Sequence, residues 1–290
     1  MFRSKPRLLS LCRASRFSCP LPVRAVVRDE KKGREWSKRG CEVVIADMDD
    51  TNALAAAFVD AQGVFILPPT DFDPEPGYPE AIRVIKAVRA ALDVARPDRV
   101  VCLSTIGADA EQDNLLTQRT MMEEALATLF MPVTFLRAGW FLDNALWDVP
   151  TAISEGVIHS FLQPLDKKYA MVASRDVGRT AAALIRERWN GVRVIELEGP
   201  ARVSPNDLAD AFTVAVGRPV RAVPVPHETW EDIFRSQGMR YPAPRIRMLD
   251  GFNEGWIDFP GENDRRLKGR ISAGEVVASL VEAALEAETR

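Results

Sequence analysis

The sequence predicts an α/β protein built on a doubly wound parallel sheet, with a smaller α+β region in its C-terminal half. Short apolar runs alternate with segments of helical apolar period from residue 23 onward, which is the pattern of strands connected through helices. Within residues 99–144, two such runs flank one helical segment, and strands joined in this way lie parallel with a right-handed crossover. The chain has 290 residues and is 47% hydrophobic, which is enough for a sizeable core in one large or two modest domains.

The first half of the chain alternates strands and helices in a regular order. We expect strands at residues 23–27, 41–46, 63–67, 99–104 and 133–137. Helices are expected between them, at residues 30–39, 51–59, 80–94 and 115–129. Thr51 is the expected N-cap of the second helix, whose inward face should carry Leu54, Ala57 and Phe58. The Pro- and Asp-rich residues 70–79 predict an exposed loop.

After residue 144 the apolar pattern loosens into the smaller region. Strands are expected at residues 169–173, 192–197 and 220–225, and helices at residues 175–188, 205–216, 228–237, around 248–256 and 273–288. Ser174, Ser204 and Ser272 are the expected N-caps, the last with Glu275 as a capping box, and Gly217 should end the helix that Ser204 begins.

The first 28 residues differ in composition from the rest of the chain. They carry seven basic side chains and no acidic one. One interpretation is an organellar targeting presequence, because such segments are rich in Arg and Ser and free of acids. The other is that the start of the domain has been lost or misread, because the pattern that follows begins in the middle of a fold. We therefore divide the chain into an atypical or disordered segment (1–22), a nucleotide-binding-type domain (23–150) and a C-terminal region (151–290).

Composition also limits the classes of partner that the protein is expected to bind. The formal net charge is -3 and no dense basic stripe follows the first segment, so we expect no nucleic-acid partner. No apolar run reaches the ~18 residues that span a bilayer, so no membrane partner is expected either. Cys12, Cys19, Cys41 and Cys102 lack metal-type spacing, which favours reduced thiols in a cytoplasmic protein. The two histidines leave little material for a His-based metal site, and we expect His227 to be an exposed or capping residue.

Topology predicts where a ligand should bind. In open parallel sheets the ligand lies beyond the carboxyl ends of the strands. In residues 99–144 this rule selects Ser104, Thr105, Ala138, Gly139 and Trp140.

Seven segments together resemble one protein family. They read VRAVVRD, CEVVIADMDD, GVFILPP, VVCLSTIGAD, MEEALATLFMPVTFLRAGWFLDN, SRDVG and SPNDLADAFTVAVGRPVRAVPVP, in this order from residue 23 onward. This series resembles the NmrA-like family, an atypical branch of the short-chain dehydrogenase/reductase superfamily. The resemblance implies an NAD(P)-binding, Rossmann-like domain and a small C-terminal substrate region. It also implies either an NAD(P)H-dependent reductase of quinone- or azo-type compounds or a redox sensor that binds the cofactor without turning it over.

The resemblance assigns residues to the cofactor. Arg28 matches the basic residue that takes a 2'-phosphate, which favours NADP(H) over NAD(H), with a solvated strand-end Arg as the alternative. Asp47 and Met48 match the segment along the adenine, although an Asp after a strand is as often a turn former. Leu67, Pro68 and Pro69 match the segment beside the nicotinamide-side ribose. The alternative is an ordinary end of a strand.

The catalytic positions depart from the superfamily pattern. Ser104 and Thr105 lie where the superfamily places a catalytic hydroxyl, but Arg119 and Glu123 stand where it places a Tyr and a Lys. Glu123 cannot supply the charge of that lysine. Arg119 could contact a phosphate or ribose if it points into the cleft. The alternative is an i,i+4 pair on the surface of an amphipathic helix.

Three residues after the second strand of this unit are assigned to the pocket. Trp140, Phe141 and Asn144 match the family's aromatic and amide positions, where they should wall the nicotinamide and substrate pocket. Plain core packing is the alternative.

A glycine-rich phosphate turn is missing from the expected place. The family's turn should precede residue 23, but the first glycines of the chain are Gly33 and Gly40. We therefore expect weakened dinucleotide binding. A strand at residues 7–12 would fill the central position of the sheet but would bring no phosphate clamp.

Three functions remain open from the sequence. The first is an NAD(P)H-dependent reductase that passes hydride to a flat small-molecule electrophile, a reaction that needs mostly orientation of donor and acceptor. The second is a cofactor-responsive regulator whose C-terminal region contacts a protein partner. The third is an inactive product without the phosphate turn.

Overall fold

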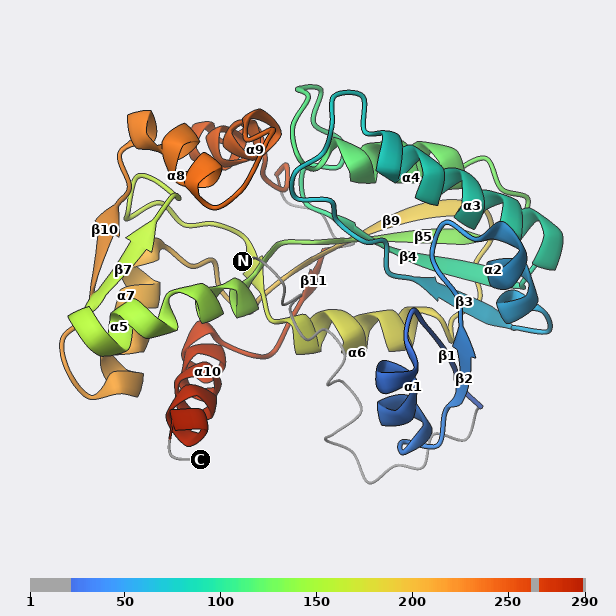
Figure 1. Ribbon diagram of the computed structural model, residues 1–290, viewed down its shortest axis with the longest axis horizontal. Helices are drawn as coiled ribbons and strands as arrows, with labels where there is room; N and C mark the ends of the chain where they lie inside the picture. The colour runs from blue at the N-terminus through green and yellow to red at the C-terminus, as the bar shows by residue number, and fades with distance from the viewer. Residues whose placement is uncertain (1–21, 262–265, 289–290) are drawn as a thin grey trace.

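The main sheet of the molecule is parallel and has five strands (Figure 1). The computed structural model describes residues 22–261 and 266–288. The strand order is β11-β9-β5-β4-β3, and every pair in it runs parallel. The strands are β3 (Gly63–Ile66), β4 (Arg99–Thr105), β5 (Val133–Ala138), β9 (Val192–Glu198) and β11 (Leu267–Lys268). The predicted α/β class with a parallel sheet is confirmed, and β11 is a strand that the sequence pattern missed.

Two further strands form a separate parallel pair. They are β1 (Arg24–Val27) and β2 (Glu42–Ile45). In the doubly wound order 3-2-1-4-5-6, one strand lies between the strand that β1 represents and the one that β3 represents. Within the described residues no strand fills that place, so the predicted continuous sheet is interrupted between β1 and β3. The strand suggested at residues 7–12 lies outside the described residues.

Helices cover both faces of these strands, as a doubly wound fold requires (Figure 1). On one face, α2 (Thr51–Phe58), α3 (Pro79–Ala95) and α4 (Thr117–Leu126) enclose the largest apolar core with β3 and β4. On the other face, α1 (Glu30–Ser37) packs on β1 and β2, and α6 (Ser174–Leu184) packs on β4 and β5. The predicted inward residues of α2, namely Leu54, Ala57 and Phe58, are buried.

The C-terminal region is a smaller α+β layer beside the carboxyl ends of the sheet. Its strand pairs are β7 (Val157–Ser160) with β10 (Arg221–Pro224) and β6 (Trp140–Phe141) with β8 (Met171–Val172). Its helices are η1 (Leu142–Trp147), α5 (Val149–Glu155), α7 (Pro205–Val216), η2 (His227–Thr229), α8 (Trp230–Ser236), α9 (Ala243–Glu254) and α10 (Ala273–Glu288). The chain passes from the sheet into this region through β6 and returns to the sheet through α6 and β9. After a second excursion from α7 to α9, it reaches the sheet edge at β11 before α10.

Two of the expected helix caps are wrong and two are confirmed. Thr51 is the first residue of α2, and the cap is Asp50, whose carboxylate accepts from the Ala53 amide at 3.0 Å. Ser174 opens α6 without capping it. Ser204 forms a reciprocal capping box with Asp207, and Ser272 forms one with Glu275, as the S-x-x-D/E spacing predicts.

Asp143 supplies the hydrogen-bond acceptors that cap the N-terminus of α6. Its two carboxylate oxygens accept from the backbone amide and the hydroxyl of Ser174, at 2.7 and 2.6 Å. An acceptor distant in sequence therefore replaces the local cap, because the chain of η1 passes in front of the helix N-terminus. This bond ties the segment after Trp140 to the sheet layer.

Asp176 ties the returning chain to the first turn of α6. Its side chain is buried, and one carboxylate oxygen accepts from the amides of Arg270 and Ile271 at 2.7 and 2.8 Å. The chain passes so close that a Cβ on Gly269 would lie 2.6 Å from that oxygen. A side chain is therefore excluded at residue 269.

Cys102 carries a buried free thiol. No helix of residues 22–261 or 266–288 is long and apolar enough to cross a bilayer.

Asp148 gives the fold a pH-dependent stability. Burial raises the pKa of this carboxyl from its ordinary 3.8 to about 7. The folded state then holds a proton that the unfolded chain releases, so the penalty is absent below about pH 4, grows as pH rises and is complete above about pH 7. Asp148→Asn should therefore raise the free energy of unfolding at about pH 8 by up to roughly 4 kcal/mol, and the melting temperature by several degrees. At about pH 4 it should change both quantities little.

The matched control for this prediction is Asp210→Asn, which changes an exposed carboxylate of α7. Thermal unfolding followed by circular dichroism at several pH values is the measurement. An Asp148→Asn gain that is the same at both pH values, or no larger than that of Asp210→Asn, would contradict the assignment.

Candidate functional site

The carboxyl ends of β4 and β5 hold a buried polar cluster. Ser104 and Arg137 are cross-strand neighbours in this pair, and Glu123 reaches them from α4. The Ser104 hydroxyl donates to Oε1 of Glu123. The guanidinium of Arg137 donates through Nε to Oε1 of Glu123 at 3.0 Å and through Nη2 to Oε2 at 2.7 Å. Ser104 is 4% exposed and Glu123 8% exposed, so the cluster is closed to bulk water.

The charges of this cluster compensate one another. Burial by itself lowers the pKa of Arg137, but the carboxylates of Glu123 and Asp109 outweigh burial and hold that pKa above its ordinary value. Asp109 contributes from the loop after β4, at 2.7 Å from Nη1 of Arg137. The bidentate geometry between Arg137 and Glu123 is the strong form of such a pair.

The cluster decides what Ser104 can do. A carboxylate paired with a guanidinium only accepts hydrogen bonds, so the Ser104 hydroxyl is the donor in its bond with Glu123. The single hydroxyl proton is thereby committed to Glu123. Ser104 has only lone pairs left for a ligand, and it is not a hydrogen-bond donor to a substrate carbonyl while this bond persists.

Arg119 occupies a second, half-buried position. Its Nη2 donates to the carbonyl of Pro68 at 3.0 Å and to the hydroxyl of Thr70 at 2.5 Å, and the carbonyl of Pro69 lies 3.3 Å away. Burial lowers the pKa of Arg119 to about 10, which leaves the guanidinium charged at neutral pH. Arg119 therefore fixes the loop after β3, where Pro68 is buried and Leu67 exposed.

The expected surface pair between Arg119 and Glu123 is wrong. Both side chains point inward from α4, and each binds a different partner. The helical period places residues 119 and 123 on one face, but that face lies against the sheet rather than in water. The 119/123 positions are thus part of the interior, as in the superfamily pattern, with different chemistry.

Arg137 and Asp109 are the site residues that sequence reasoning missed. The signal for Arg137 was a lone basic residue inside an otherwise apolar strand, which requires a buried partner. The signal for Asp109 was weaker, because an Asp in a loop has many ordinary explanations.

The residues after β5 have identifiable packing roles. A Cβ on Gly139 would lie 2.5 Å from the carbonyl oxygen of Ala170, so the close passage of β6 and β8 requires glycine there. Trp140 meets Phe252 of α9 edge-on, with ring centroids 5.2 Å apart, and Phe141 packs toward the α6 side of the sheet. Asn144 is half-buried in η1. The core-packing alternative for Trp140 and Phe141 has contacts in its support, and their role as pocket walls stays a prediction.

The remaining strand ends carry the other predicted ligand residues. Thr105 ends β4 and pairs in register with Ala138 of β5, so the two flank the carboxyl edge. Arg28 follows β1, is exposed, and has no ion pair within the described residues. Asp47 is exposed and accepts from the amide of Met48 at 2.7 Å, which is the turn-forming role open to it.

The described residues fit two of the three parts of a dinucleotide. An exposed Arg28 at the carboxyl end of β1 suits an adenosine 2'-phosphate, and the loop that Arg119 holds lies at the carboxyl end of β3. For the pyrophosphate they offer no glycine-rich turn, and the N-termini of α1 and α2 are already capped by Asp29 and Asp50. These ends fit NAD(P)H, and the phosphate part lies outside what the described residues provide.

No metal site accompanies this cluster. The described residues contain no group of three His, Cys, Asp or Glu placed to hold an ion. His227 is exposed, as expected, and its Nε2 lies 2.9 Å from Asp250.

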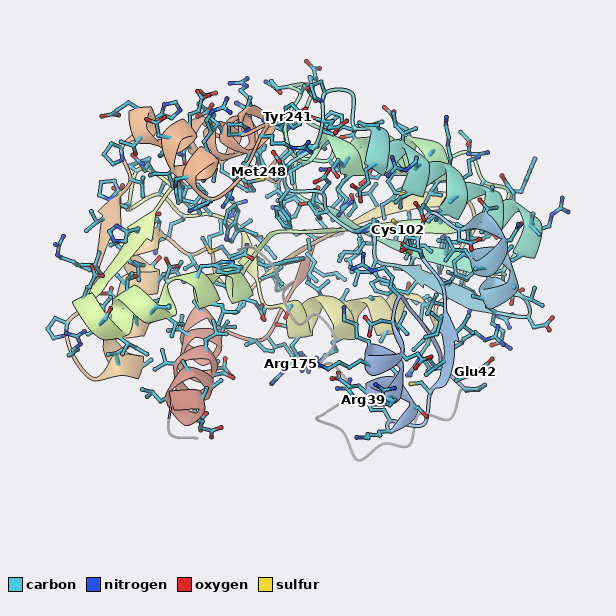
Figure 2. All side chains as sticks on the ribbon, in the orientation of Figure 1. Arg39, Glu42, Cys102, Arg175, Tyr241 and Met248 are labelled. Atoms are coloured by element: carbon cyan, nitrogen blue, oxygen red, sulfur yellow. The ribbon has the colours of Figure 1, made fainter. Side chains whose placement is uncertain are left out.

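Figure 2 shows how the C-terminal region meets the site. Tyr241 lies just before α9 and Met248 lies within it, beside the loops that follow β3 and β4, while Cys102 lies in the sheet. Asp73 of the first loop accepts from the amides of Arg240 and Tyr241 at 2.9 and 2.6 Å. The loop after β3 is therefore held from both sides, by α4 and by the segment before α9.

The Glu123–Arg137 pair should govern stability. The two side chains are 10% and 13% exposed, and removing one partner of a buried pair typically costs about 3–5 kcal/mol. Glu123→Ala should therefore lower the free energy of unfolding by about that amount, because Arg137 keeps only Asp109. The double variant Glu123→Leu with Arg137→Met should recover at least half of the loss, since neither charge stays buried alone.

Urea unfolding of the two variants and of Glu124→Ala measures this effect. Glu124 is the exposed neighbour on α4 and serves as the control. The assignment is contradicted if Glu123→Ala loses no more stability than Glu124→Ala, or if the double variant is less stable than Glu123→Ala.

Comparisons with known proteins bear on the family and the fold of this chain. The model of the NmrA-like family matches residues 13–253. The NAD(P)H azoreductase of Xenophilus azovorans is 26% identical over 226 residues, which is 76% of this chain and 74% of that protein. A crystal structure of an NADPH-dependent quinone oxidoreductase from Escherichia coli superposes with a TM-score of 0.72 at 21% identity, covering 90% of this chain and 92% of that one.

A structure of NmrA, a negative transcriptional regulator in complex with NAD, is also similar. Its TM-score is 0.69 at 18% identity, with 92% of this chain and 90% of that chain covered. At such identities the two solved structures establish a shared fold. Enzymes and a regulator therefore share this architecture.

Proposed function

The chain belongs to the NmrA-like family, and on that premise we propose that it is an NAD(P)H-dependent reductase of small, flat electrophiles of the quinone or azo type. The observation that carries the proposal is the carboxyl edge of β3, β4 and β5, where an ordered loop, a buried polar cluster and Trp140 surround one place. A relative described as an NAD(P)H azoreductase supports the electrophile class.

The residues of the chain orient the reactants in this proposal. When bound, NAD(P)H supplies a hydride from its nicotinamide ring. Arg119 keeps the loop of Pro68 and Pro69 in place beside that ring, and Gly139 lets β6 bring Trp140 to the same edge. The reaction then depends on holding donor and acceptor together. In favourable cases this orientation alone lowers the activation barrier by about 7 kcal/mol or more.

The cluster excludes one step of the superfamily pattern. Ser104 is committed as donor to Glu123, and neither a Tyr nor a Lys stands at positions 119 and 123. We infer that no side chain of this cluster protonates the substrate. Acceptors whose reduced form is a stable anion or a neutral molecule are then favoured, and water supplies any later proton.

Three finer points belong to the same proposal. We propose that the enzyme prefers NADP(H) to NAD(H), because Arg28 is free to pair with a 2'-phosphate. We expect the chain to bind the cofactor weakly, because it has no glycine-rich turn before residue 23. We propose that the protein works in the cytoplasm, in line with the free thiol of Cys102. Its proposed partner is a small molecule, and neither nucleic acid nor membrane.

Fluorescence titration with NADPH and NADH, followed by NADPH oxidation with a panel of quinones and azo compounds, tests the proposal. Binding with turnover supports a reductase. Binding without turnover on any acceptor would overturn it in favour of a cofactor-responsive regulator, for which the similarity to NmrA is the specific observation. Absence of binding to both nucleotides would overturn both functions.

Arg28→Ala should weaken NADPH binding about tenfold to a hundredfold and leave NADH binding nearly unchanged, because only NADPH carries the 2'-phosphate. Arg34→Ala on α1 removes an exposed Arg that pairs with Glu30, and it is the matched control. The dissociation constants come from the same titration. Equal losses for both nucleotides would refute the phosphate role of Arg28.

A further inference from the structure

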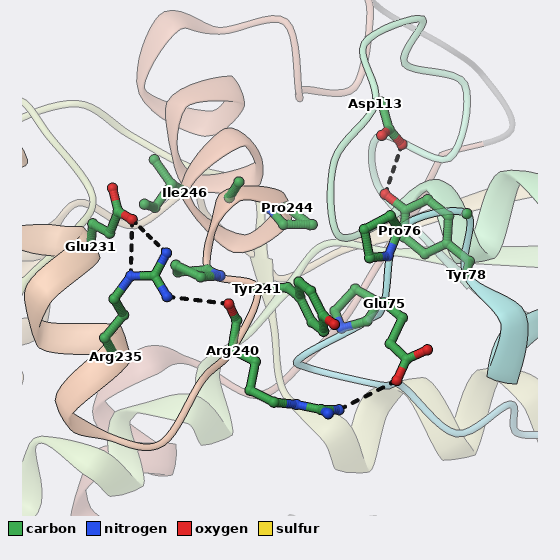
Figure 3. Close-up of a pocket in the computed structure, with 14 residues that line it drawn as sticks. Glu75, Pro76, Tyr78, Asp113, Glu231, Arg235, Arg240, Tyr241, Pro244 and Ile246 are labelled. Carbon is green, nitrogen blue, oxygen red and sulfur yellow. Dashed lines mark hydrogen bonds and ion pairs between the residues drawn. The ribbon is translucent and has the colours of Figure 1, made fainter.

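A pocket of about 350 Å³ opens between the two regions of the molecule (Figure 3). One wall is the loop after β3, at residues 74–78, and the other is the segment that leads from α8 into α9. The volume of the pocket lies in the range of small-molecule sites. Its width depends on how the loop is held against that segment.

Asp73 joins the two walls of this pocket. Its Oδ1 accepts from the backbone amides of Arg240 and Tyr241 at 2.9 and 2.6 Å, and its Oδ2 also lies 2.9 Å from the Arg240 amide. Hydrogen bonds to an ionised carboxylate are roughly twice as strong as those between neutral groups. Asp73 therefore binds the backbone of the segment before α9 and fixes its course beside the loop.

Gln118 holds the same loop two residues earlier, from the side of the sheet. Its carboxamide accepts from the Asp71 amide at 3.2 Å and donates to the Asp71 carbonyl at 2.8 Å. Gln118 is buried on α4, next to Arg119, which holds residues 68–70. The loop is thus attached to α4 over residues 68–71 and to the C-terminal region at residue 73.

The link between these two attachments is short and stiff. The Asp71 carboxylate accepts from the Asp73 amide at 3.0 Å, which closes a turn between the two attachment points. Pro74 follows directly and is buried, and its ring restricts the backbone further. A stiff link transmits displacement, so a movement of the segment before α9 is passed through Asp73 to Asp71 and from there to α4.

Each wall of the pocket carries an aromatic ring near these attachments. Tyr241, whose amide Asp73 binds, lines the pocket, and the Arg240 guanidinium lies over its ring at 5.3 Å from the centroid. Tyr78 is buried in the loop wall with a left-handed backbone, at φ of 55°, and its hydroxyl donates to Asp113 at 2.7 Å. A ligand in the pocket therefore lies between rings that belong to the two regions.

We propose that Asp73 is a positioning residue, which couples the segment before α9 to the loop after β3 and thereby sets how the acceptor faces the nicotinamide ring. This inference rests on the proposed reductase function and adds a residue to it. Asp73 acts through the two amides before α9 on one side and through residues 68–71 on the other. Because the reaction depends on orientation, a loose contact at Asp73 slows it without removing any group that touches the reactants.

Asp73→Ala and Asp73→Asn separate the amide bonds from the charge. Asn keeps the Oδ1 acceptor, which by itself reaches both amides, and loses the charge that lies 3.7 Å from Nε of Arg240. Ala removes the acceptor altogether. Asp232→Ala changes an exposed carboxylate of α8 that does not line the pocket, and it is the matched control. In every variant the Leu115 amide still donates to the Pro244 carbonyl, which keeps the start of α9 attached.

Hydrogen exchange of the full-length protein without cofactor, resolved by residue, tests the coupling. Asp73→Ala should speed exchange at the Arg240 and Tyr241 amides about tenfold or more, because it removes their acceptor. It should also speed exchange at the Asp71 amide, whose partner is Gln118. Gln118→Met, which keeps the volume and loses the carboxamide, should speed exchange at the two amides before α9. Asp73→Asn and the control should match the wild type, and effects confined to each variant's own contacts would overturn the coupling.

NADPH oxidation with menadione tests the positioning role. Asp73→Ala should lower kcat about tenfold to a hundredfold, since a misplacement of about 1 Å can cost that much. The Kd of NADPH and the number of nucleotides bound per chain should stay unchanged, which excludes an unfolded fraction as the cause. Asp73→Asn should keep at least about a third of the wild-type kcat, because it retains the amide bonds.

The two measurements separate this proposal from the reductase proposal. If the wild type oxidises NADPH and Asp73→Ala equals it in kcat, or Asp73→Asn loses as much as Asp73→Ala, the positioning role is wrong while the reductase stands. If the wild type oxidises NADPH with no acceptor, the reductase proposal falls, and hydrogen exchange alone decides whether Asp73 couples the two regions.

Discussion

The buried ion pair between Glu123 and Arg137 is the interaction on which the site depends. It joins α4 to β5 at the carboxyl edge of the sheet, and its carboxylate accepts a hydrogen bond from the hydroxyl of Ser104 on β4. Three elements thus converge on two largely buried charges. Each charge would be very costly alone in the interior, so the pair and its partners have to form together.

This arrangement changes the chemistry that the fold can perform. The superfamily pattern places a phenol and an ammonium at the two α4 positions that here carry Arg119 and Glu123. Arg119 has a structural task instead, because its guanidinium holds the carbonyls of the loop after β3. The result is a site with a fixed loop and a closed polar cluster but no available acid. Orientation of two flat partners is then the effect that the protein contributes.

The same loop links the site to the pocket beside α9. Arg119 holds its beginning, and Asp73 binds the amides before α9 further along. The loop therefore has fixed contacts with the sheet layer and with the C-terminal region. Between these contacts Tyr78 adopts its left-handed backbone, and its ring becomes part of the pocket wall.

The sequence by itself determined the element order, the parallel connection of β4 and β5 and most strand bounds, because apolar period and turn residues are local signals. Leu54, Ala57 and Phe58 were placed inside, and Ser204 and Ser272 were placed at helix starts, from spacing alone. Only the tertiary structure decided that Asp143 caps α6, that residues 119 and 123 face the sheet and that Arg137 neutralises Glu123. These outcomes join residues far apart in the chain, and the helical period shows that two side chains share a face without showing what that face meets.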